Sequence, residues 1–274
     1  MTNTLPAPAV RRTQRSTLSV CVAGAGAIGQ AVADALSANR VPGATLTAVL
    51  TSRSSTDDVE RAIDASDIIV EATTVAAARS LVPRVTRRGK DIVVCSSGVL
   101  AEYDTVDDLR GGTGRVLLPT GALGGFDILS AAARAGTRDA RVRHTTIKRP
   151  SALGVDEPLT SPREIFTGSA REAALAFPRT SNSSVALALA TIGLDRVEVV
   201  VVADPDATNT RHIVEWSSPV GNYELTFTNA VDPTSGGRTS AITAWSVTAV
   251  VAALLQGVGS GAVVLDSNLS PVAE

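Results

Sequence analysis

The chain has 274 residues, of which 44% are hydrophobic and 19% charged, and its formal net charge at pH 7 is -2. This length suffices for one large or two modest domains. The sequence has no basic run with interleaved aromatic residues, so no nucleic-acid partner is expected. It also lacks an apolar run of about 18 residues, so no membrane-spanning helix is expected.

The opening residues and the two cysteines indicate where the protein is located. Residues 1–17 lack the apolar centre of a signal peptide and predict a flexible tail, with an arm onto a partner subunit as the alternative. Cys21 and Cys95 both fall in apolar runs, which predicts buried thiols in a reducing compartment rather than a disulfide. We therefore expect a soluble, cytoplasmic protein.

The first half of the chain alternates predicted strands with predicted helices. Residues 18–23 form a short apolar run typical of a buried parallel strand, and AIGQAVADALSA follows with helical periodicity. Further strands are predicted in TLTAVLTS, DIIVEAT, DIVVCSS and RVLLPTG, with a helix in AAARSLVPRVTRRG. This order predicts a doubly wound, parallel α/β domain over residues 18–119.

The pattern changes after Gly121 and predicts a smaller α+β domain over residues 120–239. A helix is expected in FDILSAAARAG, a strand in RVRHTTIKRP, a helix broken at Pro178, a strand in RVEVVVVADP, and two antiparallel strands in RHIVEWSSPVGNYELTFTNAV. The apolar segment 240–260 predicts a last helix that a Thr or Ser caps and that returns to the first domain.

A glycine-rich turn follows the first predicted strand and opens the first helix. Its residues GAGAIG fit the pattern G-x-G-x-x-G, in which Gly24 allows a tight turn, Gly26 admits a pyrophosphate, and Gly29 lets helix and strand pack closely. Ala27 and Ile28 begin the helix, whose N-terminal N–H groups attract anions. The turn predicts a Rossmann domain that binds NAD or NADP; the alternative is a turn for another anion or for none.

The end of the second strand bears on the choice between NAD and NADP. NAD sites often place a carboxylate there, but VLTSRSST has none before Asp57. Ser52 and Arg53 suit a 2′-phosphate instead, because a guanidinium binds phosphate through two hydrogen bonds. We expect NADP to be favoured, unless Arg53 is a solvated loop residue.

Four polar or glycine-rich stretches at predicted strand ends, together with GGRTSAIT, carry a resemblance to a known family. The stretches are SSGVL, which contains Ser97 and Gly98, and LPTGALGGFD, FPRTSN and ADPDATNTRH. In this order, and over roughly residues 18–260, the chain resembles the L-aspartate dehydrogenases. PTGALGGFD is the most specific piece. The chain departs from the common family pattern at Ala27, Thr120 and Thr180 and in the spacing from Asn209 to His212.

The resemblance implies an activity and several site residues. It implies that Ala122 and Asn182 contact the nicotinamide, that His212 is the active-site histidine, and that the protein is a homodimer through the second-domain sheet. Members of this family reversibly deaminate L-aspartate to iminosuccinate, which hydrolyses to oxaloacetate. In some organisms iminosuccinate feeds NAD synthesis.

The chemistry of such a reaction requires proton transfer and a grip on two carboxylates. A histidine suits proton transfer because its ordinary pKa is about 6.5; the alternative is that His212 is a spectator on a strand. Arg238, Thr239 and Ser240 are the favoured carboxylate clamp, since they are expected to open the last helix. Lys148, Arg149 and Arg211 are further candidates or solvated charges. Asn209 is a candidate to orient the histidine, and Asn182 and Asn209 are alternatively cap or turn residues.

The second histidine, His144, is expected to be an exposed strand residue because Arg141 and Arg143 flank it. No paired-histidine motif of a dihydrodipicolinate reductase and no Cys-His cluster for zinc is present. Three functions stay open. They are an NAD(P)-dependent aspartate dehydrogenase, an imine or keto-acid reductase on the same scaffold, and a nucleotide-binding protein without turnover.

Overall fold

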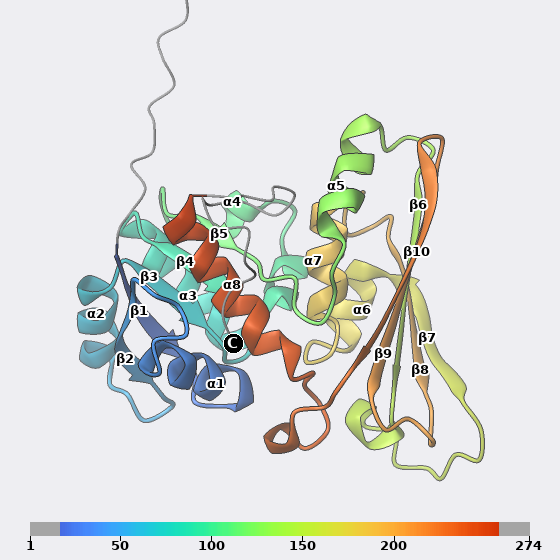
Figure 1. Ribbon diagram of the computed structural model, residues 1–274, viewed down its shortest axis with the longest axis horizontal. Coiled ribbons are helices and arrows are strands. Elements are labelled where there is room, and N and C mark those ends of the chain that lie inside the picture. The colour runs from blue at the N-terminus through green and yellow to red at the C-terminus, as the bar shows by residue number, and fades with distance from the viewer. Residues whose placement is uncertain (1–16, 258–274) are drawn as a thin grey trace, which may run out of the picture.

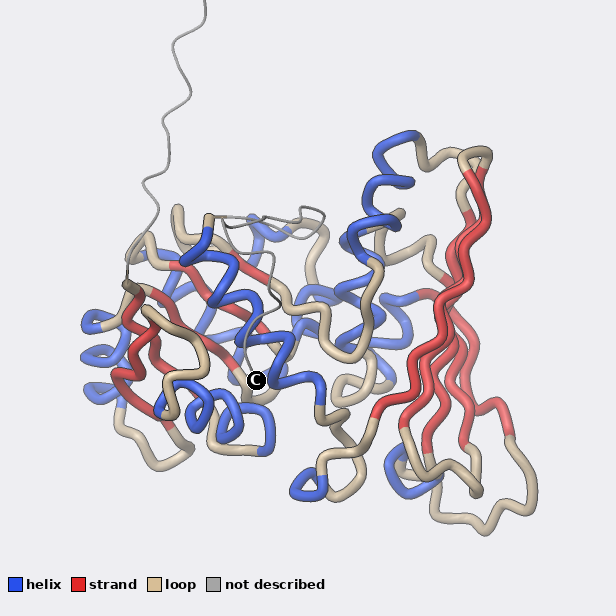
Figure 2. The backbone as a smooth tube through the Cα atoms, in the orientation of Figure 1, coloured by secondary structure: helices blue, strands red, loops and turns tan. Residues whose placement is uncertain are grey.

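The computed structural model describes residues 17–257, which form two sheets with helices packed around them (Figure 1). The predicted tail lies outside the described residues except for Thr17, and so do residues 258–260 of the predicted last helix. Figure 2 shows the two sheets standing apart, with helices between them and beside the first. Within residues 17–257, no helix is long and apolar enough to cross a membrane.

The first sheet is entirely parallel, with the strand order β2-β1-β3-β4-β5. Its strands are β1 (Leu18–Ala23), β2 (Ala44–Leu50), β3 (Ile68–Glu71), β4 (Asp91–Val94) and β5 (Val116–Leu117). Its helices are α1 (Ala27–Ser37), α2 (Thr56–Ala65), α3 (Val75–Arg87), the 3-10 helix η1 (Ser97–Glu102) and α4 (Val106–Leu109). The chain thus has the doubly wound α/β domain that its alternating pattern predicts.

Both faces of this sheet are covered, which explains why β1 is apolar throughout. Val20 and Val22 face a core shared with α1 and with α8 (Ile242–Gln256), whereas Cys21 and Ala23 face the core of α2 and α3. The sequence analysis placed no helix at α2. This charge-rich helix is set by a capping box, in which Ser55 and Asp58 satisfy each other's backbone N–H groups.

The second sheet is mixed, with the strand order β10-β9-β6-β8-β7, and only β6 and β8 run parallel. Its strands are β6 (Arg141–Lys148), β7 (Arg163–Ser169), β8 (Glu198–Ala203), β9 (Thr210–Ser218) and β10 (Gly221–Asn229). Its helices are α5 (Phe126–Ala135), α6 (Ala170–Ala176) and α7 (Asn182–Ala190), with 3-10 turns η2 (Pro150–Leu153) and η3 (Pro233–Ser235). The predicted break at Pro178 and the predicted hairpin β9-β10 are confirmed, while β7 was not predicted.

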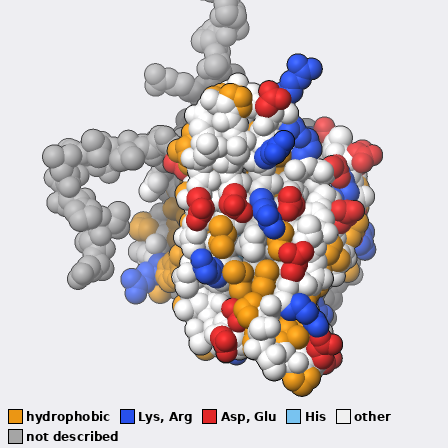
Figure 3. All heavy atoms as spheres, turned by 90° about the vertical axis from the view of Figure 1, so that its right-hand side faces the viewer, with side chains coloured by type: hydrophobic (Ala, Val, Ile, Leu, Met, Phe, Trp, Pro, Cys, Tyr) orange, Lys and Arg blue, Asp and Glu red, His pale blue; other side chains and the backbone are white. Residues whose placement is uncertain are grey.

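One face of the second sheet packs on α5, α6 and α7, and the other is open (Figure 1). We call the latter the outer face; its middle carries Ile147, Val200, Val202 and Ile213, with Arg143 and Glu198 paired beside them. Figure 3 looks onto this side and shows hydrophobic side chains among charged ones. In β8, the remaining apolar residues face the helices inside the chain: Val199, Val201 and Ala203.

The expectation that His144 is exposed is wrong, since its side chain is 0% exposed. Residues of β6 alternate between the two faces, so Arg141 and Arg143 point outward while His144 points inward with Val142. The flanking arginines therefore describe the opposite face of the strand.

The last helix begins later than predicted and without the predicted cap. Its N-cap is Ala241, which has no side-chain cap hydrogen bond. Residues 239–241 instead pair with 230–232, through the backbone bonds Asp232 N to Thr239 O and Ala241 N to Ala230 O. Thr239 and Ser240 therefore belong to a short antiparallel bridge that precedes the helix, and they do not form its first turn.

Candidate functional site

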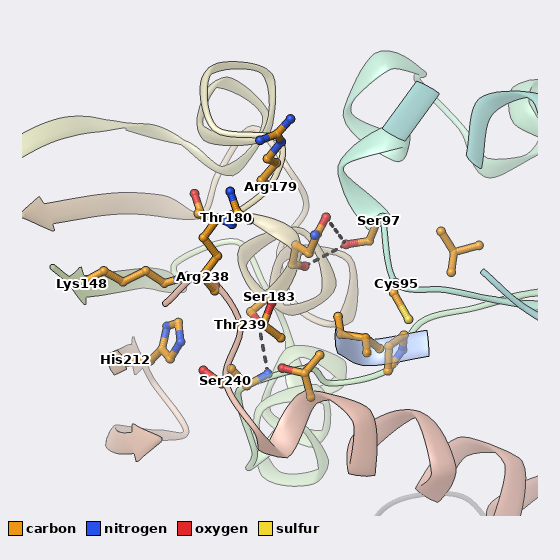
Figure 4. Close-up of a pocket in the computed structure, with 17 residues that line it drawn as sticks. Cys95, Ser97, Lys148, Arg179, Thr180, Ser183, His212, Arg238, Thr239 and Ser240 are labelled. Atoms are coloured by element: carbon orange, nitrogen blue, oxygen red, sulfur yellow. Dashed lines mark hydrogen bonds between the residues drawn. The ribbon is translucent and has the colours of Figure 1, made fainter. Parts of the chain in front are cut away.

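A pocket lies where the carboxyl edge of the parallel sheet meets the inner face of the second sheet (Figure 4). Cys95 and Ser97 lie on the side of the first sheet, His212 and Lys148 lie on the side of the second, and Arg238 stands between them. Ligands of open α/β sheets bind outside the carboxyl ends of the strands. The pocket therefore has the position expected of an active site.

The glycine turn borders this pocket and has the geometry of a pyrophosphate cradle. Gly24 has a φ of +115°, and a Cβ there would lie 2.2 Å from Ala72 O. A Cβ on Gly29 would lie 2.0 Å from Gly24 O, so α1 packs against β1 only if this residue is glycine. At Gly26, by contrast, a Cβ would meet nothing within 4 Å. The turn thus leaves open space at the N-terminus of α1, where free N–H groups attract phosphate.

A buried carboxylate that the sequence analysis missed shapes the neighbouring turns. Glu71, at the end of β3, is 0% exposed and accepts hydrogen bonds from the backbone N and hydroxyl of both Thr73 and Ser96. It therefore ties the end of β3 to the end of β4. A glutamate at the end of a strand gives no sign in the sequence that four donors surround it.

The turn after β4 is joined to the start of α7. Asn182 Oδ1 accepts from the backbone N of Gly98 at 3.0 Å, and Ser97 Oγ donates to Asn182 O at 2.9 Å. Ala122 is held from two sides, because its N donates to Ser183 Oγ at 3.3 Å and its O accepts from Asn229 Nδ2 at 2.8 Å. Elements from both halves of the chain thus fix the wall between the two sheets.

Three cationic side chains line the pocket: Lys148, Arg179 and Arg238. Its lining includes no aspartate or glutamate. Lys148 is 6% exposed, its Nζ donates to Arg238 O at 3.2 Å, and burial lowers its pKa to about 8. The pocket is therefore built to attract an anion. Of the other predicted clamps, Arg211 points to the outer face and Arg149 lines a different surface hollow.

His212 reaches the pocket from β9, and its ring touches that of His144 on β6. His144 Nε2 and His212 Nδ1 are 3.1 Å apart, and the ring centroids are 5.2 Å apart. Burial, followed by the charges of His144 and Lys148, holds the pKa of His212 well below its ordinary value. Burial, followed by Lys148, lowers the pKa of His144 to about 4. Both rings are therefore neutral at physiological pH.

The predicted residues fall into four groups. The pocket lining includes nine of them: Ile28, Ser97, Ala122, Lys148, Asn182, His212, Arg238, Thr239 and Ser240. The adjoining turns hold Gly24, Gly26, Ala27, Gly29 and Gly98. Ser52 and Arg53 lie in the exposed turn after β2, beside the glycine turn, because Gly24 N donates to Leu50 O. Asn209 is exposed and is not part of the lining, so it does not touch the pocket side of His212.

The lining also contains residues that the sequence analysis did not assign: Cys95, Arg179, Ser183 and Thr243. Arg179 lies inside the FPRTSN stretch, so its charge was the available signal. Cys95 stays a thiol, since burial, followed by the charge of Glu71, raises its pKa well above the ordinary value. Among residues 17–257, no group of three or more His, Cys, Asp or Glu side chains could hold a metal ion.

Comparison with known proteins agrees with this site. Residues 127–254 match the family model described as aspartate dehydrogenase, C-terminal, and residues 24–113 match the one described as homoserine dehydrogenase, NAD binding domain. The chain is 34% identical to the L-aspartate dehydrogenase of Bradyrhizobium diazoefficiens, over 88% of this chain and 92% of the relative. It is 30% identical to that of Methanopyrus kandleri, over 89% of this chain and 98% of the relative.

Solved structures show the same architecture. The crystal structure of aspartate dehydrogenase from Thermotoga maritima matches with a TM-score of 0.63 and 25% identity, over 85% of this chain and 95% of that one. A hyperthermophilic archaeal homoserine dehydrogenase in complex with NADPH shares the fold, with a TM-score of 0.56 and 11% identity, over 89% of this chain and 99% of that one. With a nucleotide-binding domain, a C-terminal domain and a pocket of this family, the chain belongs to the L-aspartate dehydrogenase family of NAD(P)-dependent oxidoreductases.

Proposed function

We propose that the pocket performs the reversible, NAD(P)-dependent oxidation of L-aspartate to iminosuccinate, which hydrolyses to oxaloacetate and ammonia. The observation that carries this proposal is the lining, in which three cations and the neutral imidazole of His212 face a pocket without a carboxylate. A dicarboxylate with a reacting nitrogen is a ligand of matching charge. The membership of the family supports the same substrate.

The residues present fit a dinucleotide. The open space at Gly26 and the free N–H groups of α1 suit its pyrophosphate, and Ile28, Ser97, Ala122 and Asn182 lie where a nicotinamide would meet the pocket. When bound, the nicotinamide accepts or supplies the hydride exchanged with C2 of the substrate. The protein has to bind C2 close to the ring and to keep water out.

Substrate binding falls to the side of the second sheet. Lys148 and Arg238 are assigned to the carboxylates, and Thr239 and Ser240 are assigned to orient them, because these four groups line the same end of the pocket. His212 is assigned to the substituent on C2, where it handles the proton of the reacting nitrogen or oxygen. Arg179 also lines the pocket and joins the anion-binding set.

A spectrophotometric assay tests this function. Purified protein is given NADPH or NADH, oxaloacetate and ammonium, and the loss of reduced nicotinamide is followed. We expect consumption that requires ammonium, that collapses in His212→Ala and Lys148→Met, and that persists in Arg134→Ala, which removes an exposed charge of α5. Retention of wild-type rates in His212→Ala would contradict the assignment of the histidine.

A reductase for another imine or keto acid is the second candidate, since Thr180 lines the pocket where the family often has an asparagine. A panel of keto acids, each with and without ammonium, separates the two functions. A higher kcat/KM for a keto acid other than oxaloacetate would favour this candidate.

Preference for NADP is part of the proposal and rests on Arg53. Its turn is exposed and adjoins the glycine turn, and no carboxylate lies between the end of β2 and Asp57 to repel a 2′-phosphate. We expect Arg53→Ala to raise the KM for NADPH by about 10-fold or more, the cost of a lost charge-assisted pair, and to leave that for NADH unchanged. Arg40→Ala is the control, since residues 41–43 contact the opposite end of β1 and β2. Equal effects of Arg53→Ala on both cofactors would contradict this preference.

A homodimer through the outer face belongs to the same proposal. Ile147, Val202 and Ile213 are partly exposed and supply an apolar centre, and charged residues lie beside it. Light scattering should give the mass of two chains for the wild type and of one chain for Ile213→Glu. A single-chain mass for the wild type would contradict the dimer. A cytoplasmic location is proposed as well, on the support of two free, buried thiols.

A further inference from the structure

Three buried side chains stand in line behind the catalytic candidate His212. Ser184 Oγ, on α7, is 2.9 Å from His144 Nδ1, and His144 Nε2 is 3.1 Å from His212 Nδ1. Ser184, His144 and His212 are 1%, 0% and 2% exposed. The row runs from a helix through two neighbouring strands and ends at the pocket.

We propose that Ser184 and His144 are positioning residues that keep the proton of neutral His212 on Nε2, the ring nitrogen that is free to meet a ligand. The proposal deepens the proposed function, because it assigns the state in which His212 meets its ligand. It makes His212 a hydrogen-bond donor toward the pocket.

The hydroxyl of Ser184 fixes the proton of His144. Ser184 Oγ has one side-chain hydrogen-bond partner within residues 17–257, which is His144 Nδ1. A buried hydroxyl without an acceptor is costly, so Ser184 donates to this nitrogen. A nitrogen that accepts carries no proton, and a neutral imidazole has one proton. The proton of His144 is therefore on Nε2.

The same reasoning carries the proton pattern to His212. His144 Nε2–H points at His212 Nδ1, which therefore accepts and has no proton of its own. Thr146 Oγ1 lies 3.2 Å from His212 Nδ1 and 3.4 Å from His144 Nε2. Its hydroxyl can donate to His212 Nδ1 while its oxygen accepts from His144. Every donor behind His212 is then used, and the proton of His212 is on Nε2, the nitrogen left for the pocket.

The reverse pattern leaves a donor unused. If His212 carried its proton on Nδ1, it would donate to His144 Nε2, and His144 Nδ1–H would donate to Ser184 Oγ. The hydroxyl of Ser184 would then have no acceptor among the described residues. Both patterns make the same hydrogen bonds along the row. The reverse pattern leaves the buried hydroxyl of Ser184 without an acceptor, whereas the first leaves only His212 Nε2–H, which can donate to water or a ligand in the pocket, so the cluster favours the first pattern.

Both rings must be neutral for this count to hold. Burial lowers the pKa of His144 to about 4 and that of His212 well below its ordinary value. The charged groups close to the pair also oppose protonation: Lys148 follows His144 on β6, and Arg238 lines the same pocket. A second proton on either ring is therefore disfavoured, both by burial and by the neighbouring positive charges.

This proton placement has a chemical consequence for the pocket. Nε2–H donates a hydrogen bond to an imine nitrogen or a carbonyl oxygen and so makes C2 a better hydride acceptor. To accept a proton from a substrate ammonium at Nε2, both rings would have to exchange tautomers, which would leave the buried Ser184 hydroxyl without an acceptor. The resting site is thus organised for the imine or keto ligand.

The test is direct, because the chain holds only two histidines. Tag-free protein with ¹⁵N-labelled histidine is examined by long-range ¹H–¹⁵N correlation NMR near neutral pH, without substrate. We expect both rings to show protonated Nε2 and unprotonated Nδ1. A protonated Nδ1 on His212, or an averaged mixture on either ring, would overturn the proposal without any variant.

Variants then test which residue sets the pattern. Ser184→Ala should shift the ring ¹⁵N signals of both histidines toward averaged values, because the donor that fixes His144 is gone. Two control variants should keep the wild-type pattern. Ser184→Thr keeps the hydroxyl, and Thr191→Ala removes the hydroxyl of the C-cap residue of α7. An unchanged pattern in folded Ser184→Ala would remove Ser184 from its role.

The two proposals fail separately. Absence of aspartate oxidation, with Nε2–H confirmed on both rings, would contradict the proposed substrate and leave the proton placement standing. Full activity with Nδ1–H on His212 would do the reverse.

Discussion

Replacing His144 by asparagine should make the protein less sensitive to acid. Burial holds the pKa of His144 at about 4, whereas a histidine of the unfolded chain titrates at about 6.5. Between these values the unfolded chain binds a proton that the folded chain does not, so the free energy of unfolding falls as the pH falls. The loss is about 1.4 kcal/mol per pH unit and reaches about 3 kcal/mol at about pH 4.

The variant lacks this titration and should lose less stability on acidification. Between about pH 7 and about pH 4.5 the wild type should lose about 2 to 3 kcal/mol more than His144→Asn. His212 adds to the difference in the same direction, since the charge of His144 is one cause of its lowered pKa. The asparagine also removes the bond to Ser184, which lowers stability at every pH and does not affect the comparison of slopes.

Urea unfolding measures both proteins at the two pH values. Trp216 is 2% exposed in the sheet that holds both histidines, so its fluorescence follows the unfolding of that sheet. Trp245, which is 52% exposed on α8, is replaced by phenylalanine in both proteins to leave one reporter. An equal loss of stability in the two proteins would refute the reasoning, because it would mean that His144 titrates normally in the folded state.

Four other substitutions have expected outcomes. Gly26→Ala should keep the wild-type melting temperature and weaken NADPH binding in a fluorescence titration, whereas Gly29→Ala should lower the melting temperature, because only the second Cβ meets backbone. Lys148→Met should stabilise the protein in urea by as much as about 3 kcal/mol near neutral pH, since it removes a buried amine whose charged form is disfavoured, while abolishing activity. Glu71→Gln should cost about 2 kcal/mol or more by the same measurement, because an amide nitrogen would face the donors of Ser96 or Thr73.

Much of the first domain could be predicted because its signals are local. A strand covered on both faces is apolar at every position, as in β1, and the turn after it needs glycine at Gly24 and Gly29 for reasons of space. These requirements are written into consecutive residues. The helix α2 was missed because its apolar stripe is short, only Val59, Ala62 and Ile63, and lies among charged residues.

The candidate site was predictable in its members but not in its arrangement. His212, Lys148 and Arg238 were recognised from their stretches, and all three line the pocket. The contact between His144 and His212 spans 68 positions and depends on the register of β6 against β9, which no local pattern gives. The two histidines therefore lie in contact although they are far apart in the sequence.

The packing of α8 has a consequence for how this protein is made. Ala244, Val247, Val251 and Leu255 complete the core on the face of the first sheet where Val20 and Val22 lie. A ribosome delivers residues 18–117 long before this helix, so one face of the nascent sheet is covered only in part, by α1, while the whole second domain is synthesised. The first domain thus reaches its final stability only when the last helix arrives, and chains that terminate before Ile242 should be captured by chaperones or proteases.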